Sequence, residues 1–329
     1  MSIPRTHPAR YQASMHPGLK VDEEVSDDEK KNKLQEAGKI AAEIRQIISK
    51  KTKPGTSALE LCMEADDLIR KKNAVPAFPI NISINDATAH YTSPPNDTLV
   101  MPDVGVVKID VGVAIDGFIA DTAQSVDLDG SYKELIQSTI DATEIGIKLI
   151  RPDAMTGNIG GVIEKTIRDA GFKPVRELSG HLVERYVVHA GKTVPCVGEF
   201  KGDMVELGET YAIETFASSG QGSVHADMNK ITIFRASPLR VKARSPAARK
   251  VLKAAIHEFG GMPFAERWLT TTGLSRATAG RGLRELQRMG GIIEYHLLRT
   301  ASSDSVTSQH EHTMIINEDG AEVTTRDVL

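Results

Sequence analysis

The sequence predicts an α+β protein built from a duplicated unit. Apolar residues recur at helical spacing in two pairs of segments, about a hundred residues apart, and a turn with a basic residue before proline joins each pair. Strand-like sequence that carries isolated polar residues follows each helical pair. Two such halves favour a site at their junction, because ligand sites occur preferentially at interfaces between units.

The first helical pair begins at Leu34 and is interrupted by a Lys-Pro-Gly turn at residues 53–55. Ser57 precedes Glu60 by three residues, which is the spacing of a capping box, so a second helix is expected from there to about residue 72. Residues 144–168 repeat the pattern around an Arg-Pro turn. The repeat is weak in identity, but its order of elements is the same in both halves.

Residues 106–126 predict a β-hairpin with two carboxylates on one face. An Asp-Gly step at its centre suits a primed two-residue turn. That turn places Asp121 opposite Gly112, and Asp110 lies two residues along on the same face. Two carboxylates at this distance repel and raise each other's pKa unless they share a cation, so the pair indicates a metal site or a proton-sharing dyad.

Composition and charge exclude several classes of protein. The chain has 329 residues, of which 40% are hydrophobic and 26% charged, and its net charge of −4 is ordinary for a globular protein of one large or two smaller domains. No apolar run approaches a membrane span, and the N-terminus lacks the apolar core of a signal peptide, so we expect a cytoplasmic monomer without a membrane partner. Cys62 and Cys196 are too few for a disulfide framework and are expected to be buried thiols.

The charge distribution predicts three regions. Residues 1–29 are polar and are expected to form a loosely attached tail. Residues 240–299 contain twelve Lys and Arg against four Glu, a net charge of +8, and two helical patterns there precede strand-like sequence. This composition predicts an inserted helical, winged-helix-like subdomain, so the main domain is expected over residues 30–239 and 300–329.

Five potential metal ligands lie inside apolar strand-like segments: Asp110, Asp121, His181, Glu214 and Glu311. Carboxylate-rich sites with a single imidazole suit a pair of divalent ions, which can share carboxylates and one water. This pattern makes a hydrolase the leading hypothesis.

The last four of five successive segments contain these ligands, and the first contains His90: FPINISINDATAHYTSP, KIDVGVAIDGFIADTA, LSGHLVERYVVHAGKTVP, YAIETFAS and EHT. In this order and spacing they resemble the active-site motifs of type II methionine aminopeptidases, most closely the archaeal form. The resemblance covers residues 34–234 and 309–329, and the insertion between Glu214 and Glu311 resembles type II rather than type I. It implies the pita-bread (creatinase/aminopeptidase) fold with its pseudo-twofold internal repeat. It also implies removal of the N-terminal methionine from nascent proteins and peptides, with a preference for a small second residue.

The resemblance implies a role for each ligand. Asp110 would bind one cation, Asp121 and Glu311 would bridge two, and His181 and Glu214 would complete the other. Water activated by this dinuclear centre would attack the peptide, and Glu214 would also act as a proton shuttle. The two divalent ions would be Co, Mn, Fe, Zn or Ni, because availability rather than affinity selects among them.

The same motifs imply the catalytic and substrate-binding residues. His90 and His189 resemble the two histidines that hydrogen-bond the scissile amide and the developing oxyanion in this family. Phe78, Val188 and Phe216 resemble the apolar lining of the methionine pocket, with His90 at its rim. Three apolar residues in strand-like sequence are equally typical of ordinary core, so both interpretations stay open.

The chain also departs from the family pattern. Its N-terminal tail lacks the long lysine-rich and acidic blocks of the eukaryotic enzymes, which favours the shorter archaeal type. His310 directly precedes Glu311, and His312 directly follows it. Neither histidine receives a role from the resemblance, and neither removes a ligand.

Two alternative functions remain open. A non-catalytic pita-bread relative would use the scaffold to bind RNA or protein, but such relatives lose metal ligands, whereas all five are present here. A proline-specific aminopeptidase or prolidase would share the fold, but these enzymes usually carry a sizeable N-terminal domain. Only a short polar segment precedes the first expected core helix.

The basic subdomain leads to a hypothesis about partners. Four arginines recur along one expected helix: Arg276, Arg281, Arg284 and Arg288. Because nascent substrates emerge at the ribosome, this helix is expected to contact ribosomal RNA weakly through phosphates. The alternative is a solvated face of a purely structural subdomain.

Overall fold

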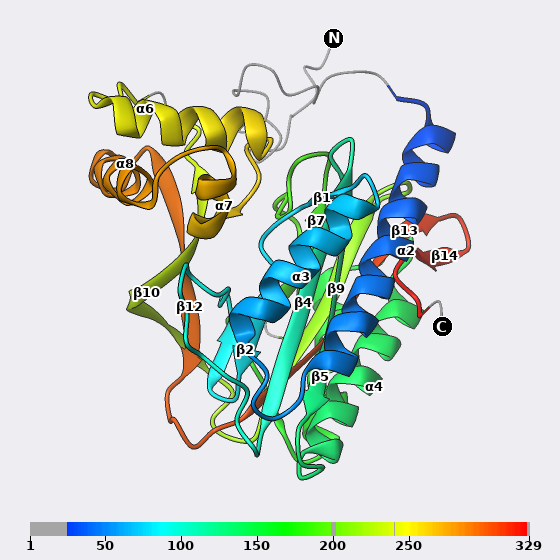
Figure 1. Ribbon diagram of the computed structural model, residues 1–329. Helices are drawn as coiled ribbons and strands as arrows, with labels where there is room; N and C mark the ends of the chain where they lie inside the picture. The colour runs from blue at the N-terminus through cyan, green and yellow to red at the C-terminus, as the bar shows by residue number, and fades with distance from the viewer. Residues whose placement is uncertain (1–24, 199–201, 240, 328–329) are drawn as a thin grey trace.

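The structure is a computed structural model that describes residues 25–198, 202–239 and 241–327 (Figure 1). Its centre is a ten-stranded sheet, whose main path runs β1-β4-β5-β13-β9-β7-β8. Helices α2, α3 and α4 lie along this sheet, and the helices of the insert gather at one end of strands β10 and β12. The protein therefore consists of a helix-covered sheet with a smaller helical unit beside it.

The predicted helical repeat is confirmed. Each half supplies a pair of contacting helices: α2 (Asp27–Lys51) with α3 (Ala58–Lys71), and α4 (Lys133–Leu149) with α5 (Thr156–Asp169). Ser57 accepts a hydrogen bond from the backbone N–H of Glu60 at 3.3 Å, so the predicted cap of α3 forms. The helices pack on the large sheet through two apolar clusters, one for each half.

Helix α2 begins earlier than the sequence pattern indicates. Ser26 caps it by accepting from the N–H of Glu29 at 3.2 Å, and acidic residues 27–29 occupy its first turn. Carboxylates are favourable there because the N-terminus of a helix carries partial positive charge. Residues 27–29, which the sequence analysis assigned to the tail, are thus helical, whereas residues 1–24 of that tail lie outside the described part of the chain.

The hairpin prediction is also confirmed. In β4 (Val106–Ile115) and β5 (Phe118–Asp127), Gly112 pairs with Asp121. Both turn residues have positive φ, 48° at Asp116 and 83° at Gly117, as a primed turn requires. The register therefore places the two carboxylates of the hairpin on one face.

The remaining strands complete two sheets. The large sheet also contains β1 (Val75–Pro76), β2 (Asn81–Ile84), β6 (Lys173–Pro174), β7 (Ser179–Val183), β8 (Thr193–Pro195), β9 (Thr210–Ser218), β13 (Thr307–Asn317) and β14 (Gly320–Val323). A four-stranded sheet runs in the order β11-β10-β12-β3. Its members are β3 (Ala87–Ala89), β10 (Val224–Ala236), β11 (Phe264–Ala265) and β12 (Ile292–Thr300).

The basic insert has its own apolar core. Its helices are α6 (Pro246–Lys253), which continues as a π-helical turn (Ala254–Glu258), α7 (Glu266–Thr271) and α8 (Arg276–Met289). They enclose a cluster that includes Phe264, Trp268 and Leu286. Strand β12 pairs with β10 along nearly its whole length and with β3 at its end. The expected boundary at residue 299 therefore falls inside a sheet strand, because the pair that enters and leaves the insert is joined by continuous backbone hydrogen bonds.

A buried polar network attaches the insert to the main domain. Asp66 of α3 accepts from the Trp268 indole at 2.6 Å and from Nε of Arg267 at 3.1 Å, and Arg267 also donates to Thr92 at 2.7 Å. Charge-assisted hydrogen bonds between buried groups hold such an interface in one geometry. The insert is therefore positioned to form one wall of any cavity above the large sheet.

Two expectations from composition concern the cysteines and membrane-spanning helices. Cys62 and Cys196 are buried free thiols, as predicted. Among residues 25–327, leaving aside the two short gaps, no helix has the length and apolar character needed to cross a bilayer.

Candidate metal centre

Five neighbouring strands each place one predicted ligand on the same face of the large sheet. The strands lie in the order β4, β5, β13, β9 and β7. Glu311 of β13 pairs directly with Glu214 of β9, and His181 of β7 pairs with Ala212, two residues from Glu214. Because side chains on a strand alternate with a period of two, this register gathers residues from both halves of the chain.

The ligand atoms converge beneath a cavity. Nε2 of His181 lies 3.8 Å from Oδ2 of Asp121 and 3.8 Å from Oε1 of Glu214. Single ligand atoms of Asp121, His181 and Glu311 lie within 4.8 Å of one another, and all three side chains are buried. Asp110 and Glu214 are half-buried, and they line the cavity together with Asp121 and His181.

Several of these oxygens have no protein partner. Oδ1 of Asp110, Oδ1 of Asp121 and both carboxylate oxygens of Glu311 are buried and accept no hydrogen bond from the described residues. Burial raises the pKa of the Asp110 carboxyl group to about 7. Burial also raises the pKa of the other three carboxyl groups of the site, and there the neighbouring carboxylates add to the effect: Asp121, Glu214 and Glu311. Uncompensated buried carboxylates are costly, and a shared divalent cation removes both the repulsion and the missing contacts. The donor set therefore fits divalent metal ions.

The imidazole is in a suitable state for this chemistry. Burial lowers the pKa of His181 to about 4, so its ring is neutral near pH 7. A neutral imidazole offers a nitrogen lone pair to a metal, whereas imidazolium does not.

One polar residue of the site, Gln309, was missed by the sequence analysis. Gln309 lies on β13 two residues before Glu311, and its Nε2 donates to Asp110 at 3.4 Å and to Glu214 at 3.3 Å. Such donors orient ligating carboxylates. The period of two along β13 would have placed Gln309 on this face, but only the sheet order brings β4 and β9 within its reach.

His90 and His189 line a cavity of about 230 Å³ above the carboxylates. The His189 ring centroid lies 4.3 Å from that of His181, and His189 remains accessible because it faces the open space. His90 adopts a left-handed φ of 67°, and its Nδ1 lies 3.3 Å from the carbonyl oxygen of His296. Desolvation lowers the pKa of both rings, so both are neutral near pH 7. Because the N–H of the neutral His90 ring donates to the His296 carbonyl oxygen, its Nε2 is a hydrogen-bond acceptor.

The apolar residues predicted for the substrate pocket line the same cavity. Phe78, Val188 and Phe216 all contribute to its wall. A Cβ at Gly112 would lie 2.2 Å from Cε1 of Phe78, so glycine at this position makes room for the aromatic ring. The three side chains are also at most 7% exposed, so they belong to the apolar core as well as to the cavity wall.

The cavity has further lining residues that no local pattern in the sequence indicated. They come from β2, from the segment before His181, from β10 and from the insert: Asn81, Glu177, Leu178, Ser179, Ile233, Pro263 and Tyr295. Ser179 lies two residues before His181 on β7 and therefore shares its strand face, so the period of two could have predicted that Ser179 lines the cavity. Tyr295 reaches the cavity because β12 pairs with β10, where it lies opposite Ile233.

Comparison with known proteins places this geometry in a family. Residues 32–258 match metallopeptidase family M24. The methionine aminopeptidase of Methanocaldococcus jannaschii is 40% identical over 294 residues, which cover 89% of this chain and 98% of that protein.

Solved structures share the fold. A thermophilic Arx1 superimposes with a TM-score of 0.81 at 18% identity, covering 92% of this chain and 91% of that one. The methionine aminopeptidase of Rickettsia prowazekii gives a TM-score of 0.66 at 23% identity, with 92% and 99% covered.

Proposed function

Because this chain belongs to metallopeptidase family M24 and, within it, to the methionine aminopeptidases, we infer that it removes the N-terminal methionine of polypeptides. The fold is the pita-bread fold that the sequence motifs imply. The observation that supports this function most is the row of five potential ligands below a cavity with an apolar wall. Family membership implies the use of divalent metal ions.

The five ligands would hold two divalent ions. Asp121 and Glu311 lie centrally in the row, which suits residues that bridge two ions, while Asp110 lies on one flank and His181 and Glu214 lie on the other. When bound, such ions polarise a carbonyl group and lower the pKa of water. The unpartnered oxygens of Asp110, Asp121 and Glu311 support this assignment, and the mixed oxygen and nitrogen set accepts Co, Mn, Fe, Zn or Ni.

The other cavity residues would act on the peptide. The neutral ring of His189 donates an N–H group to the oxygen on which negative charge develops. The Nδ1–H of neutral His90 donates to the His296 carbonyl oxygen, so its Nε2 accepts a hydrogen bond from the N–H of the scissile amide. Glu214, whose carboxylate reaches the cavity, takes a proton from the attacking water and passes it to the leaving amine. Both histidines stay uncharged near pH 7 and therefore do not compete with the cations for the carboxylates.

The apolar wall would receive the methionine side chain. Methionine is flexible and polarisable, so its thioether packs well against aromatic rings such as Phe78 and Phe216. The residue after the cleaved bond would lie between His90 and His189. We propose that this limited space restricts the second residue to small side chains.

Peptide hydrolysis tests the proposed specificity. With added Co²⁺ or Mn²⁺, Met-Ala-Ser should be cleaved and Met-Phe-Ser cleaved at least about tenfold more slowly, a difference of about 1.4 kcal/mol in transition-state stabilisation. Equal rates would contradict the size restriction. Preferred cleavage of Xaa-Pro peptides would indicate a proline-specific peptidase, and no cleavage of either would favour a non-catalytic relative.

The basic insert supports an interaction with the ribosome. Four exposed arginines lie on α8: Arg276, Arg281, Arg284 and Arg288. Three of them line a groove of about 1110 Å³ between α6 and α8, together with Arg244 and Lys250 and a single acidic side chain, Glu285. This surface suits phosphate contacts without sequence specificity. We propose weak binding to ribosomal RNA in the cytoplasm, where nascent N-termini appear.

Co-sedimentation tests the interaction with ribosomes. Triple replacement of Arg281, Arg284 and Arg288 by Glu should abolish co-sedimentation at low salt and leave Met-Ala-Ser hydrolysis unchanged. The matched control reverses three exposed lysines at the ends of α2 and α3: Lys50, Lys53 and Lys71. Failure of the wild type to co-sediment at low salt, or equal loss in the control, would leave the insert with a structural role only.

A further inference from the structure

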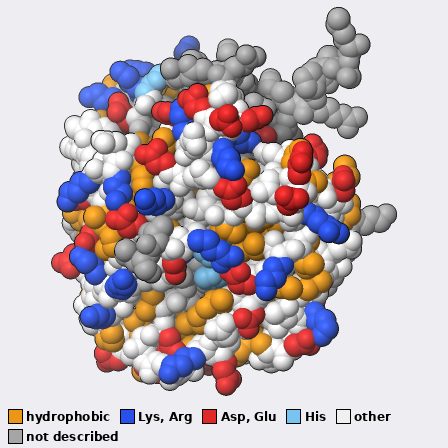
Figure 2. Space-filling view, turned by 90° about the vertical axis from the view of Figure 1, so that its right-hand side faces the viewer, with side chains coloured by type: hydrophobic (Ala, Val, Ile, Leu, Met, Phe, Trp, Pro, Cys, Tyr) orange, Lys and Arg blue, Asp and Glu red, His pale blue; other side chains and the backbone are white. Residues whose placement is uncertain are grey.

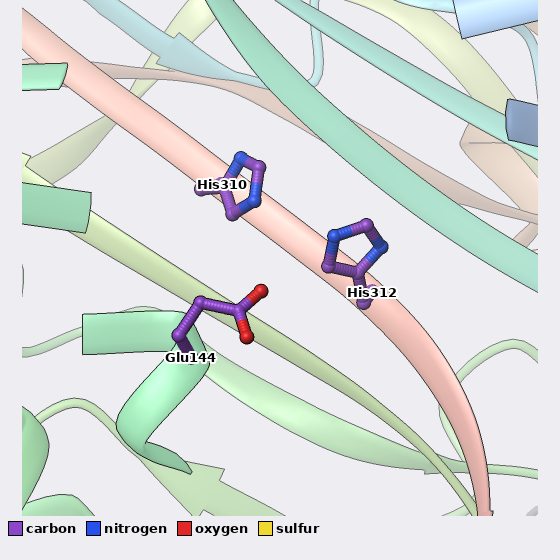
Figure 3. Close-up of side chains that lie close together, drawn as sticks. All are labelled: Glu144, His310 and His312. Atoms are coloured by element: carbon purple, nitrogen blue, oxygen red, sulfur yellow. The ribbon is translucent and has the colours of Figure 1, made fainter. Parts of the chain in front are cut away.

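A second group of metal-ligating side chains lies behind the candidate metal centre. Gln309 and Glu311 point from β13 to the sheet face that carries Asp110 and Glu214, so His310 and His312 point to the opposite face, where helix α4 packs. Figure 3 shows the carboxylate of Glu144, from α4, directed toward the two imidazole rings. One ligand atom from each of these three residues lies within 4.8 Å of the others.

We propose that Glu144, His310 and His312 form an additional site for a first-row divalent cation of the zinc type, separate from the catalytic centre. Two imidazoles and one carboxylate are a common set of three protein ligands for zinc, with water in the remaining position. The rings are set edge to face, with centroids 5.1 Å apart and an interplanar angle of 89°. Two rings in this arrangement can direct nitrogen atoms at one point beside the Glu144 carboxylate.

The protein already orients one of the proposed ligands. Nδ1 of His312 lies 2.9 Å from Oγ1 of Thr325, and the same hydroxyl oxygen accepts the backbone N–H of Thr313 at 3.1 Å. When Nδ1–H of His312 donates to Thr325, Nε2 carries the lone pair. A second hydrogen bond that fixes the tautomer and ring orientation is typical of metal-bound histidine.

Two guanidinium groups flank the cluster, and each is paired with a carboxylate. Arg45 is hydrogen-bonded to Asp327 and Thr122, and Arg326 donates two hydrogen bonds to Glu144. A cation at the proposed site must therefore compete with Arg326 for Glu144. The side chain of Arg326 is 49% exposed, so it can turn into solvent at small cost, as exposed ion pairs contribute little.

The location is accessible from solvent. Glu144 and His310 are half-buried rather than enclosed. Figure 2 views the side of the molecule that carries α2 and α4, and acidic and basic side chains alternate over it without an extended basic patch that would repel a cation. A bound ion would connect α4 to β13 directly behind Glu311, so it would stabilise the strand that supplies part of the catalytic centre.

Zinc titration of the metal-free, full-length protein tests the site. Wild type should bind one more equivalent of Zn²⁺ in equilibrium dialysis than Glu144→Gln or His310→Ala, and its melting temperature should rise further on adding Zn²⁺. Loss of a ligand should weaken this equivalent at least about tenfold. Arg326→Gln should instead strengthen it by about two- to fivefold, because the competing cation is gone.

The controls separate this site from the catalytic one. Glu134→Gln removes an exposed carboxylate elsewhere on α4 and should bind as much Zn²⁺ as wild type. Glu144→Gln should retain Met-Ala-Ser hydrolysis, which also reports that it is folded. Equal zinc stoichiometry in wild type and Glu144→Gln, or no change in affinity for Arg326→Gln, would overturn the proposal. Neither outcome would alter the assignment of the aminopeptidase activity.

Discussion

Replacing Asp121 by Asn, or Glu311 by Gln, is expected to abolish cleavage of Met-Ala-Ser and to leave the protein folded. Both carboxylates are buried in the middle of the ligand row, and each has a buried oxygen without a protein partner. Neutral amides are much weaker ligands for hard divalent ions, so the second ion should be lost. The value of kcat/KM should fall by well over tenfold, which corresponds to more than about 1.4 kcal/mol of transition-state stabilisation.

The stability of the metal-free variants provides a second measurement. Burial and neighbouring carboxylates raise the pKa of Asp121 and of Glu311 in the folded state. A raised folded-state pKa destabilises the metal-free fold at neutral pH, because the unfolded chain ionises more readily. Asn or Gln removes that penalty, so the metal-free melting temperature should be equal to or above that of wild type.

A matched substitution shows whether the loss is specific. Asp141→Asn alters an exposed carboxylate on α4 and should change neither activity nor metal content. Retention of more than about a tenth of wild-type kcat/KM in Asp121→Asn or Glu311→Gln would contradict the two-ion assignment.

Replacing His189 by Ala should lower kcat by about two to three orders of magnitude, the usual effect of losing one oxyanion donor. The His189 ring lines the cavity beside His181 but belongs to no group of converging ligand atoms found among the described residues. Metal content should therefore equal that of wild type when both are measured by elemental analysis after dialysis.

The control for this substitution is His225→Ala. His225 is exposed on β10, away from the cavity lining, and its removal should leave kcat unchanged. A His189→Ala variant that loses a metal ion together with its activity would show that His189 is a ligand, and the assignment of roles among the histidines would then be wrong.

Local chemistry explains the elements that the sequence predicted well. The Asp-Gly step set the turn between β4 and β5, and the turn set the register that places Asp110 and Asp121 on one face. Ser57 marked the start of α3 in the same way. Such features depend on residues within a few positions of each other, so a single sequence contains the information.

The pairing of β12 and the start of α2 differ from what the sequence pattern indicated. Strand β12 was assigned to the insert because it follows the insert helices, yet its hydrogen bonds with β10 and β3 make it part of a sheet shared with the main domain. Start signals for α2 were present in Ser26 and the acidic residues after it. Their polar composition is equally typical of a tail, but in the structure the Ser26 side chain caps the helix.

For the site, the sequence by itself determined which residues could act as ligands and, through the period of two, which of them share a strand face. Only the tertiary structure decided that Gln309 reaches Asp110 and Glu214, that Tyr295 closes the cavity, and that His310 and His312 meet Glu144 behind the sheet. The physical reason is that strand neighbours and helix packing depend on chain segments far apart in sequence, whose contacts have no local signature.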